Sequence, residues 1–75
     1  MNKLEDQIKN LMRKFFKQKN IDENSSINNI KNWDSLNHVN LINLISQKYS
    51  IKVSFVEMVN ISSVKDVIKI VKKKL

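Results

Sequence analysis

The residues best suited to chemistry lie together in the segment Trp33-Asp34-Ser35-Leu36. A helix is predicted to begin here, because Asp34 suits an N-cap whose carboxylate accepts hydrogen bonds from first-turn N–H groups. Ser35 would then present its hydroxyl in the first turn, where the helix dipole favours an anion and would stabilise a phosphate ester. The plainer interpretation is that Asp34 and Ser35 only start the helix, since both residue types are common there.

Catalysis by these residues is not expected. Ser35 and His38 lie three apart on one helix face, but neighbours on one turn rarely reproduce the geometry of nucleophile, base and orienting acid. A single His with scattered carboxylates also offers no metal-site spacing. We therefore predict no catalytic residue and no metal ligand. His38 is expected at the surface or against a partner, and Trp33 as a half-buried anchor for the loop before it.

The segment before the motif is predicted to hold one helix and one long loop. Apolar residues at helical spacing predict a helix over residues 3–18, with Asn20 ending it because Asn tolerates the left-handed conformation. A polar connection over residues 20–34 follows, and its isoleucines should hold it against the core. The buried positions would be Leu4, Ile8, Leu11, Met12 and Phe15 in the helix and Ile21, Ile27 and Ile30 in the loop.

Three further helices are predicted after the motif. The helix over residues 35–49 carries apolar side chains around more than half its circumference and should be the most buried. A serine followed three residues later by an acid predicts a helix start, which occurs at Ser54 for a short helix over residues 54–59 and at Ser63 for the last helix. The buried face of that last helix would consist of Val64, Val67, Ile68 and Val71. The predicted fold is all-α, with three main helices and a short one in a single domain over residues 1–75.

The composition excludes several classes of protein. The 75 residues include 13 Lys and one Arg against 7 acids, for a net charge of +7, and there is no Cys, Gly or Pro. Disulfides, Cys-ligated zinc and glycine-rich phosphate loops are therefore excluded. A small basic nucleic-acid-binding protein stays as an alternative, although no set of base-reading side chains stands out. No apolar stretch could span a membrane and no leader pattern is seen, so a cytoplasmic protein is expected.

The motif and the order of elements together resemble the acyl carrier protein family. Asp34-Ser35-Leu36 matches the family's attachment motif at the start of its second helix. The resemblance covers nearly the whole chain, because Ile51-Lys52-Val53-Ser54 and Ile61-Ser62-Ser63-Val64 match the segments before the third and last helices. It implies a small four-helix bundle of acyl-carrier type. Trp33 before the motif is similar to carriers from specialised pathways.

The resemblance implies a function for each residue of the motif. Ser35 would accept a 4′-phosphopantetheine arm, whose thiol holds an acyl or aminoacyl group and explains a carrier without Cys. Asp34 would assist the transferase near its Mg²⁺, and Leu36 would be an apolar contact. The protein would be a non-catalytic monomer whose partners are a phosphopantetheinyl transferase, an acyl- or aminoacyl-loading ligase and downstream transferases. A third possibility is a carrier-like structural subunit that is never modified.

One departure from the family concerns partner recognition. Family members usually carry acids along the second and third helices, whereas residues 35–49 contain none and residues 54–59 contain Glu57 alone. Partner binding is therefore predicted to rest more on apolar contacts. The predicted partner-binding residues are Leu36, Val39, Phe55, Val56 and Met58. The alternative is that Phe55 and Val56 are partly buried, or exposed without a function.

Overall fold

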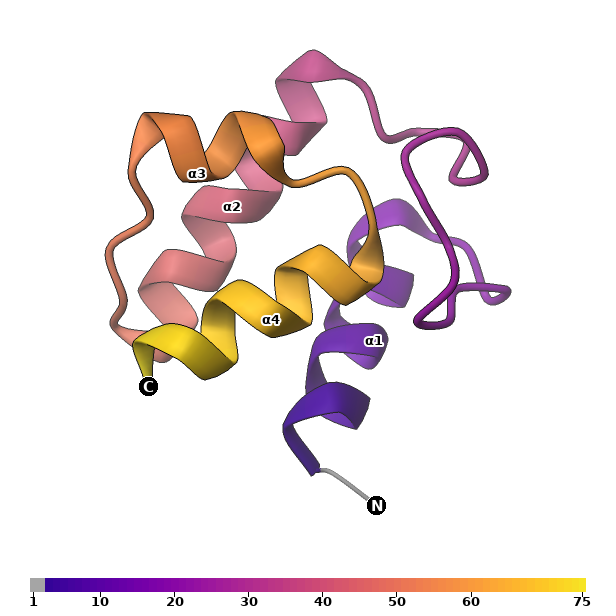
Figure 1. Ribbon diagram of the computed structural model, residues 1–75. Helices are drawn as coiled ribbons and strands as arrows, with labels where there is room; N and C mark the ends of the chain where they lie inside the picture. Colours follow the sequence, from indigo (N-terminus) through magenta and orange to yellow (C-terminus); the bar gives the residue numbers. More distant parts are fainter. Residues whose placement is uncertain (1–2) are drawn as a thin grey trace.

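Four helices account for the regular structure of residues 3–75, the part of the chain that the computed structural model describes (Figure 1). They are α1 (Lys3–Phe16), α2 (Ser35–Tyr49), α3 (Phe55–Asn60) and α4 (Val64–Lys74). The predicted all-α fold with one short helix is confirmed. No helix of residues 3–75 is long and apolar enough to cross a membrane.

The helix starts follow the predicted capping patterns. Asp34 caps α2 by accepting a hydrogen bond from the Asn37 N–H at 2.9 Å. At α3, the Ser54 hydroxyl and the Glu57 carboxylate each accept from the other residue's backbone N–H, which is a complete capping box. The start of α4 differs in one bond, because the Asp66 carboxylate accepts from the N–H of Ser62 at 3.0 Å instead of from the cap residue.

The ends of α1 and α2 lie where the chain adopts left-handed backbone without glycine, whereas α3 ends at Ile61 in extended backbone. The first helix ends at Phe16, so the predicted end at residue 18 and the stop at Asn20 were wrong. Lys17 takes the left-handed conformation (φ 53°), and the Gln18 N–H donates to the carbonyl of Arg13 at 3.1 Å. Ser50 (φ 54°) ends α2 in the same way. Both ends are therefore closed by a residue in the left-handed conformation, a position that glycine usually occupies.

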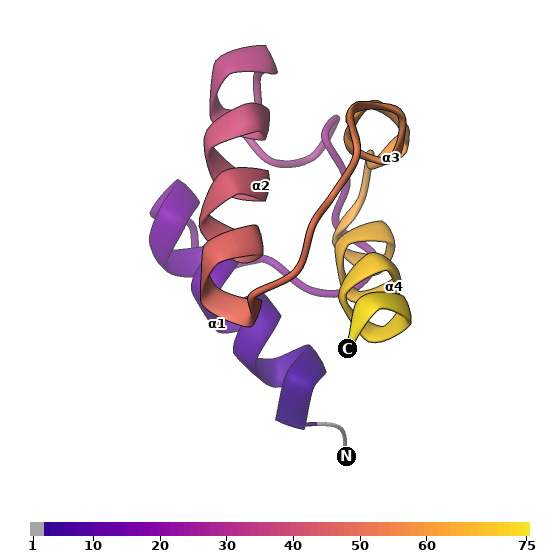
Figure 2. The same cartoon turned by 90° about the vertical axis from the view of Figure 1, so that its left-hand side faces the viewer.

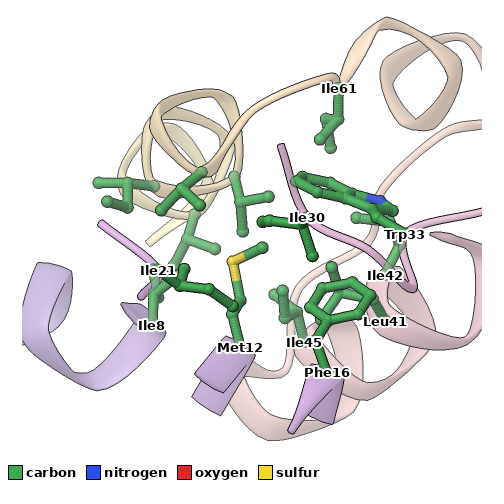
Figure 3. Packing of buried hydrophobic residues seen from close by; sticks show 14 of the residues in the cluster. Ile8, Met12, Phe16, Ile21, Ile30, Trp33, Leu41, Ile42, Ile45 and Ile61 are labelled. Atoms are coloured by element: carbon green, nitrogen blue, oxygen red, sulfur yellow. The ribbon is translucent and has the colours of Figure 1, made fainter. Parts of the chain in front are cut away.

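The core lies between α1, α2 and α4 (Figure 3). Helix α1 contributes Ile8, Met12 and Phe16, which are spaced four apart and so lie on one face. Phe16 thus occupies the core position predicted for Phe15, which is only partly buried and packs against the cluster. The predicted face of α4 is confirmed, since all four residues assigned to it are buried, while Ile70 beside them is only partly buried. The four buried residues are Val64, Val67, Ile68 and Val71.

Helix α2 is less buried than its apolar content predicted. In Figure 2 it stands on one side of the molecule, with α3 and α4 on the other. Only one face of α2 reaches the core, and Leu36, Val39 and Leu44 on its other faces are exposed. Helix α3 contains no fully buried residue. The two elements nearest the motif therefore leave apolar side chains at the surface.

The loop before α2 is fastened to the start of α4. Ile21 and Ile30 are buried as predicted, whereas Ile27 is exposed. A single antiparallel bridge pairs Ser26 with Ser63, and within it the Ile27 N–H donates to the carbonyl of Ser62 at 2.8 Å. Backbone pairing, and not the side chain of Ile27, thus holds this part of the loop in place.

Candidate functional site

Ser35 is the first residue of α2 and is exposed to solvent. The turn that presents it is held by several hydrogen bonds. The carbonyl of Asp34 accepts from the His38 N–H at 2.8 Å, and the Asn37 side-chain amide donates to the carbonyl of Asn32 at 2.8 Å. The predicted site residues Asp34, Ser35 and Leu36 are therefore all exposed on a well-fixed turn.

A hollow of about 290 Å³ adjoins Ser35 between α2 and α3. Apart from Ser35 and His38, its lining is entirely apolar. The lining residues are Ile27, Ser35, His38, Val39, Phe55, Met58, Val59 and Ile61. The hollow explains the exposure of Ile27, which faces this space and not the core. A chain attached to Ser35 would thus have an apolar surface directly beside it.

His38 is buried, so the prediction that it lies at the surface was wrong. It exposes only 9% of its area, and both ring nitrogens have partners. The indole Nε1–H of Trp33 donates to Nδ1 at 2.8 Å, and Nε2 lies 2.7 Å from the carbonyl oxygen of Met58. Neither nitrogen is left to activate the Ser35 hydroxyl, and this geometry agrees with the expectation that the residues form no catalytic pair.

Trp33 is a core residue and not the half-buried anchor that was predicted. It exposes 4% of its area, and its ring lies 5.5 Å from that of Phe16 and 5.9 Å from that of His38, measured between centroids. Figure 3 shows the indole beside Ile30 and Ile61, with its nitrogen at the edge of the cluster. Trp33 therefore joins the end of the loop to the core and to α2.

Apolar side chains are exposed around Ser35 on α2 and α3. The exposed fractions are 72% for Leu36, 73% for Phe55, 65% for Val56 and 55% for Val59, and we call these four residues the apolar face. Three of them were predicted as partner contacts. Val59 was not, although it follows Phe55 by four positions and so lies on the same side of α3.

The two other predicted contacts, Val39 and Met58, are less accessible than the apolar face. Val39 is exposed over 39% of its area, and both residues line the hollow. Met58 is only partly buried and packs against the core, while its carbonyl accepts the bond from His38. These two residues therefore belong to the border between the apolar face and the interior.

The one acid of α3 is turned toward α4. The carboxylate of Glu57 accepts from the Ser54 N–H at 2.9 Å and pairs with the ammonium of Lys74 at 2.9 Å. The backbone bond from Ser54 and then the bond from Lys74 lower the pKa of Glu57 from 4.5 to about 2. Since α2 carries no acid, the surface formed by α2 and α3 offers no unpaired carboxylate beyond the capping Asp34.

The site has no features of a metal centre within residues 3–75. In that range, no three His, Asp or Glu side chains are grouped so that they could hold an ion. The site instead consists of an exposed hydroxyl, an adjoining apolar hollow and exposed apolar side chains.

Comparison with known proteins identifies a structural relative. No protein-family model matches the chain, and no curated protein sequence matches it significantly. Among solved structures, the chain is similar to the solution NMR structure of a holo acyl carrier protein from Geobacter metallireducens. The TM-score is 0.82 at 32% sequence identity, and the match covers 95% of this chain and 84% of that one.

Proposed function

This chain belongs to the acyl carrier protein family, and from that membership we propose that it tethers acyl or aminoacyl groups as thioesters on a 4′-phosphopantetheine arm at Ser35. Proteins of this family carry intermediates and are not enzymes. The observation that carries the assignment is the position of Ser35, which is exposed on the first turn of α2 and lines the hollow between α2 and α3.

The residues around Ser35 fit such an arm. An exposed hydroxyl can be esterified without disturbing the core, and the first turn of a helix leaves backbone N–H groups without intrahelical acceptors, which favours a nearby phosphate. The arm would supply the thiol that the chain itself lacks, because the sequence contains no Cys. Asp34 holds the turn in place through its bond to Asn37, while Leu36 offers an apolar contact directly after the attachment point.

The proposed partners are a phosphopantetheinyl transferase, an acyl- or aminoacyl-loading ligase and downstream transferases. They would dock on the apolar face with an apolar surface of their own that carries few Lys or Arg residues. The charge distribution supports this choice, since α2 has no acid and Glu57 is paired with Lys74. A strongly basic partner would find no unpaired carboxylate on α3 to contact.

Three finer assignments made from the sequence remain predictions. A specialised pathway was predicted from Trp33, and the side chain of this residue is buried in the core. The monomeric state and the cytoplasmic location also stay predictions. Neighbouring genes that encode an adenylating ligase or a ketosynthase would support a specialised pathway and identify its class.

The attachment is tested by intact mass after incubation with coenzyme A and a broad-specificity phosphopantetheinyl transferase. The native chain should gain the mass of one phosphopantetheine and Ser35→Ala should gain none. Ser50→Gly is the matched control, because it removes an exposed serine at the opposite end of α2 and should be modified normally. An unmodified native chain that binds nucleic acid in a salt-dependent manner would favour the nucleic-acid alternative instead.

A further inference from the structure

His38 contributes a buried polar side chain to the wall of the hollow beside Ser35. An indole N–H can only donate a hydrogen bond, so Nδ1 of His38 must be the acceptor in its 2.8 Å bond with Trp33. In the neutral ring the proton then lies on Nε2, which donates to the carbonyl of Met58 at 2.7 Å. The two neighbours together select one tautomer and one orientation of the ring.

The bond to Met58 is the direct polar connection between α2 and α3. Within residues 3–75, no other hydrogen bond joins these two helices. Helix α3 has few other attachments, because it buries no residue completely and its ion pair from Glu57 leads to α4. The hydrogen bond between His38 and the carbonyl of Met58 is therefore a main determinant of the position of α3.

The position of α3 in turn determines the width of the hollow. One wall consists of Ser35, His38 and Val39 on α2, and the opposite wall of Phe55, Met58 and Val59 on α3. His38 reaches across this space to the backbone of the opposite wall. A change in that bond would therefore alter the distance between the walls without altering the residues that form them.

We propose that His38 is a positioning residue that holds α3 against α2 through Met58, with its ring oriented by Trp33, and so sets the opening of the hollow beside Ser35. In this role it controls how far water reaches a group carried on Ser35, a consequence that rests on the proposed function. The side chain needs no contact with the carried group, since it acts through the position of α3.

Two substitutions of His38 test the two hydrogen bonds of its ring one at a time. The amide of Gln reaches as far from the backbone as Nε2, so His38→Gln can keep the donor to Met58. The amide of Asn reaches only as far as Nδ1, so His38→Asn can keep the acceptor for Trp33 and loses the donor. Trp33→Phe keeps an aromatic ring in the core and removes the indole N–H.

The first measurement uses the unmodified chain, so that it does not depend on the proposed function. Nitrogen-15 NMR of the imidazole should show Nδ1 unprotonated and Nε2 protonated, and Trp33→Phe should keep the proton on Nε2, because the carbonyl of Met58 still accepts from it. Amide exchange at Met58 and Ile61 should rise about tenfold in His38→Asn, the effect of one buried hydrogen bond, and stay near native in His38→Gln. Equal exchange in all variants, or a rise spread evenly over the core, would overturn the proposal.

The second measurement uses the phosphopantetheinylated chain loaded with a hexanoyl thioester. The thioester should hydrolyse faster in His38→Asn than in His38→Gln. Equal lifetimes in the two variants would overturn the control of water access, even if the exchange at α3 differs. If neither the native chain nor any variant accepts the arm, the proposed function fails. The amide exchange of the unmodified chain still decides whether His38 positions α3.

Discussion

Ser35 and His38 occupy one turn of α2, yet their polar atoms have opposite surroundings. The hydroxyl of Ser35 is at the surface, whereas the imidazole of His38 is enclosed by residues five positions before and twenty positions after it. The cap at Asp34 could be predicted because its partner lies within the same turn. The burial of His38 could not, because its partner Met58 is brought near only by the packing of α3.

The pairing of Glu57 predicts a pH dependence of stability. Its pKa is about 2 in the folded chain against the usual 4.5, and a lowered pKa means that the folded state favours the ionised form. The resulting stabilisation is fully present above pH 4.5 and is lost as the pH falls through 2. Urea unfolding across this range should therefore show a steeper loss of unfolding free energy for the native chain than for Glu57→Gln.

Asp66 serves as an internal reference for that comparison. Burial would raise its pKa, but hydrogen bonds from Ser62 and Ser63 outweigh burial and lower it. The contribution of Asp66 to the pH dependence of stability has the same sign as that of Glu57. It is present in both the native chain and Glu57→Gln, so it cancels when the two pH profiles are subtracted. Parallel pH profiles for the native chain and Glu57→Gln would show that the bonds to Ser54 and Lys74 do not stabilise the folded state.

At the scale of helices, the starts and the end of α2 were predictable, whereas the end of α1 was not. A start is encoded by a serine or aspartate and a partner three residues later, as at Ser54 and Glu57. The end of a helix is usually indicated in the sequence by a glycine, and this chain contains no glycine. Lys17 and Ser50 therefore take the left-handed conformation without any signal in their residue type. The faces of α2 were equally hard to assign, because apolar residues surround most of it.

Replacing Ser50 by glycine should stabilise the protein. Left-handed backbone costs a residue with a Cβ atom about 1–2 kcal/mol, and the greater flexibility of unfolded glycine offsets part of this gain. We expect Ser50→Gly to raise the free energy of unfolding by about 0.5–1 kcal/mol in urea titrations. Asn43→Gly, at an exposed position inside α2, is the control and should lower stability. A loss of stability in both variants would contradict the prediction.

For the whole molecule, the net charge of +7 bears on solubility and non-specific association and not on the fold. The order of the elements and the bundle itself were predictable, because each helix has its own local pattern. The apolar face was predicted only in part, since the exposure of its residues depends on how α2 and α3 are arranged. Its chemistry means that partner binding should depend little on opposite charges.

Adding a negative charge to the apolar face should therefore weaken modification. Phe55→Asp is expected to lower kcat/KM for a partner transferase by about tenfold or more, the effect of losing a central apolar contact. Leu75→Asp makes the same change at an exposed position outside the face and should have little effect. Added salt should not slow modification of the native chain, because few charge pairs would be screened.

Two other outcomes would contradict docking through apolar contacts. Equal rates for Phe55→Asp and Leu75→Asp would show that the apolar face is not used. A faster reaction of Phe55→Asp would show that the partner is basic and tolerates this carrier in spite of its missing acids.

The bridge between Ser26 and Ser63 divides the chain in a way that the helices alone do not reveal. It closes residues 27–62 into a lobe whose two ends meet at the start of α4, while α1 and α4 pack directly on one another outside that lobe. Helices α2 and α3 therefore both lie in the lobe, which is one closed stretch of chain, and the ion pair between Glu57 and Lys74 links the lobe to α4. Because Leu41, Ile42 and Ile45 of α2 belong to the same core as α1 and α4, the lobe and the two outer helices share a single hydrophobic interior.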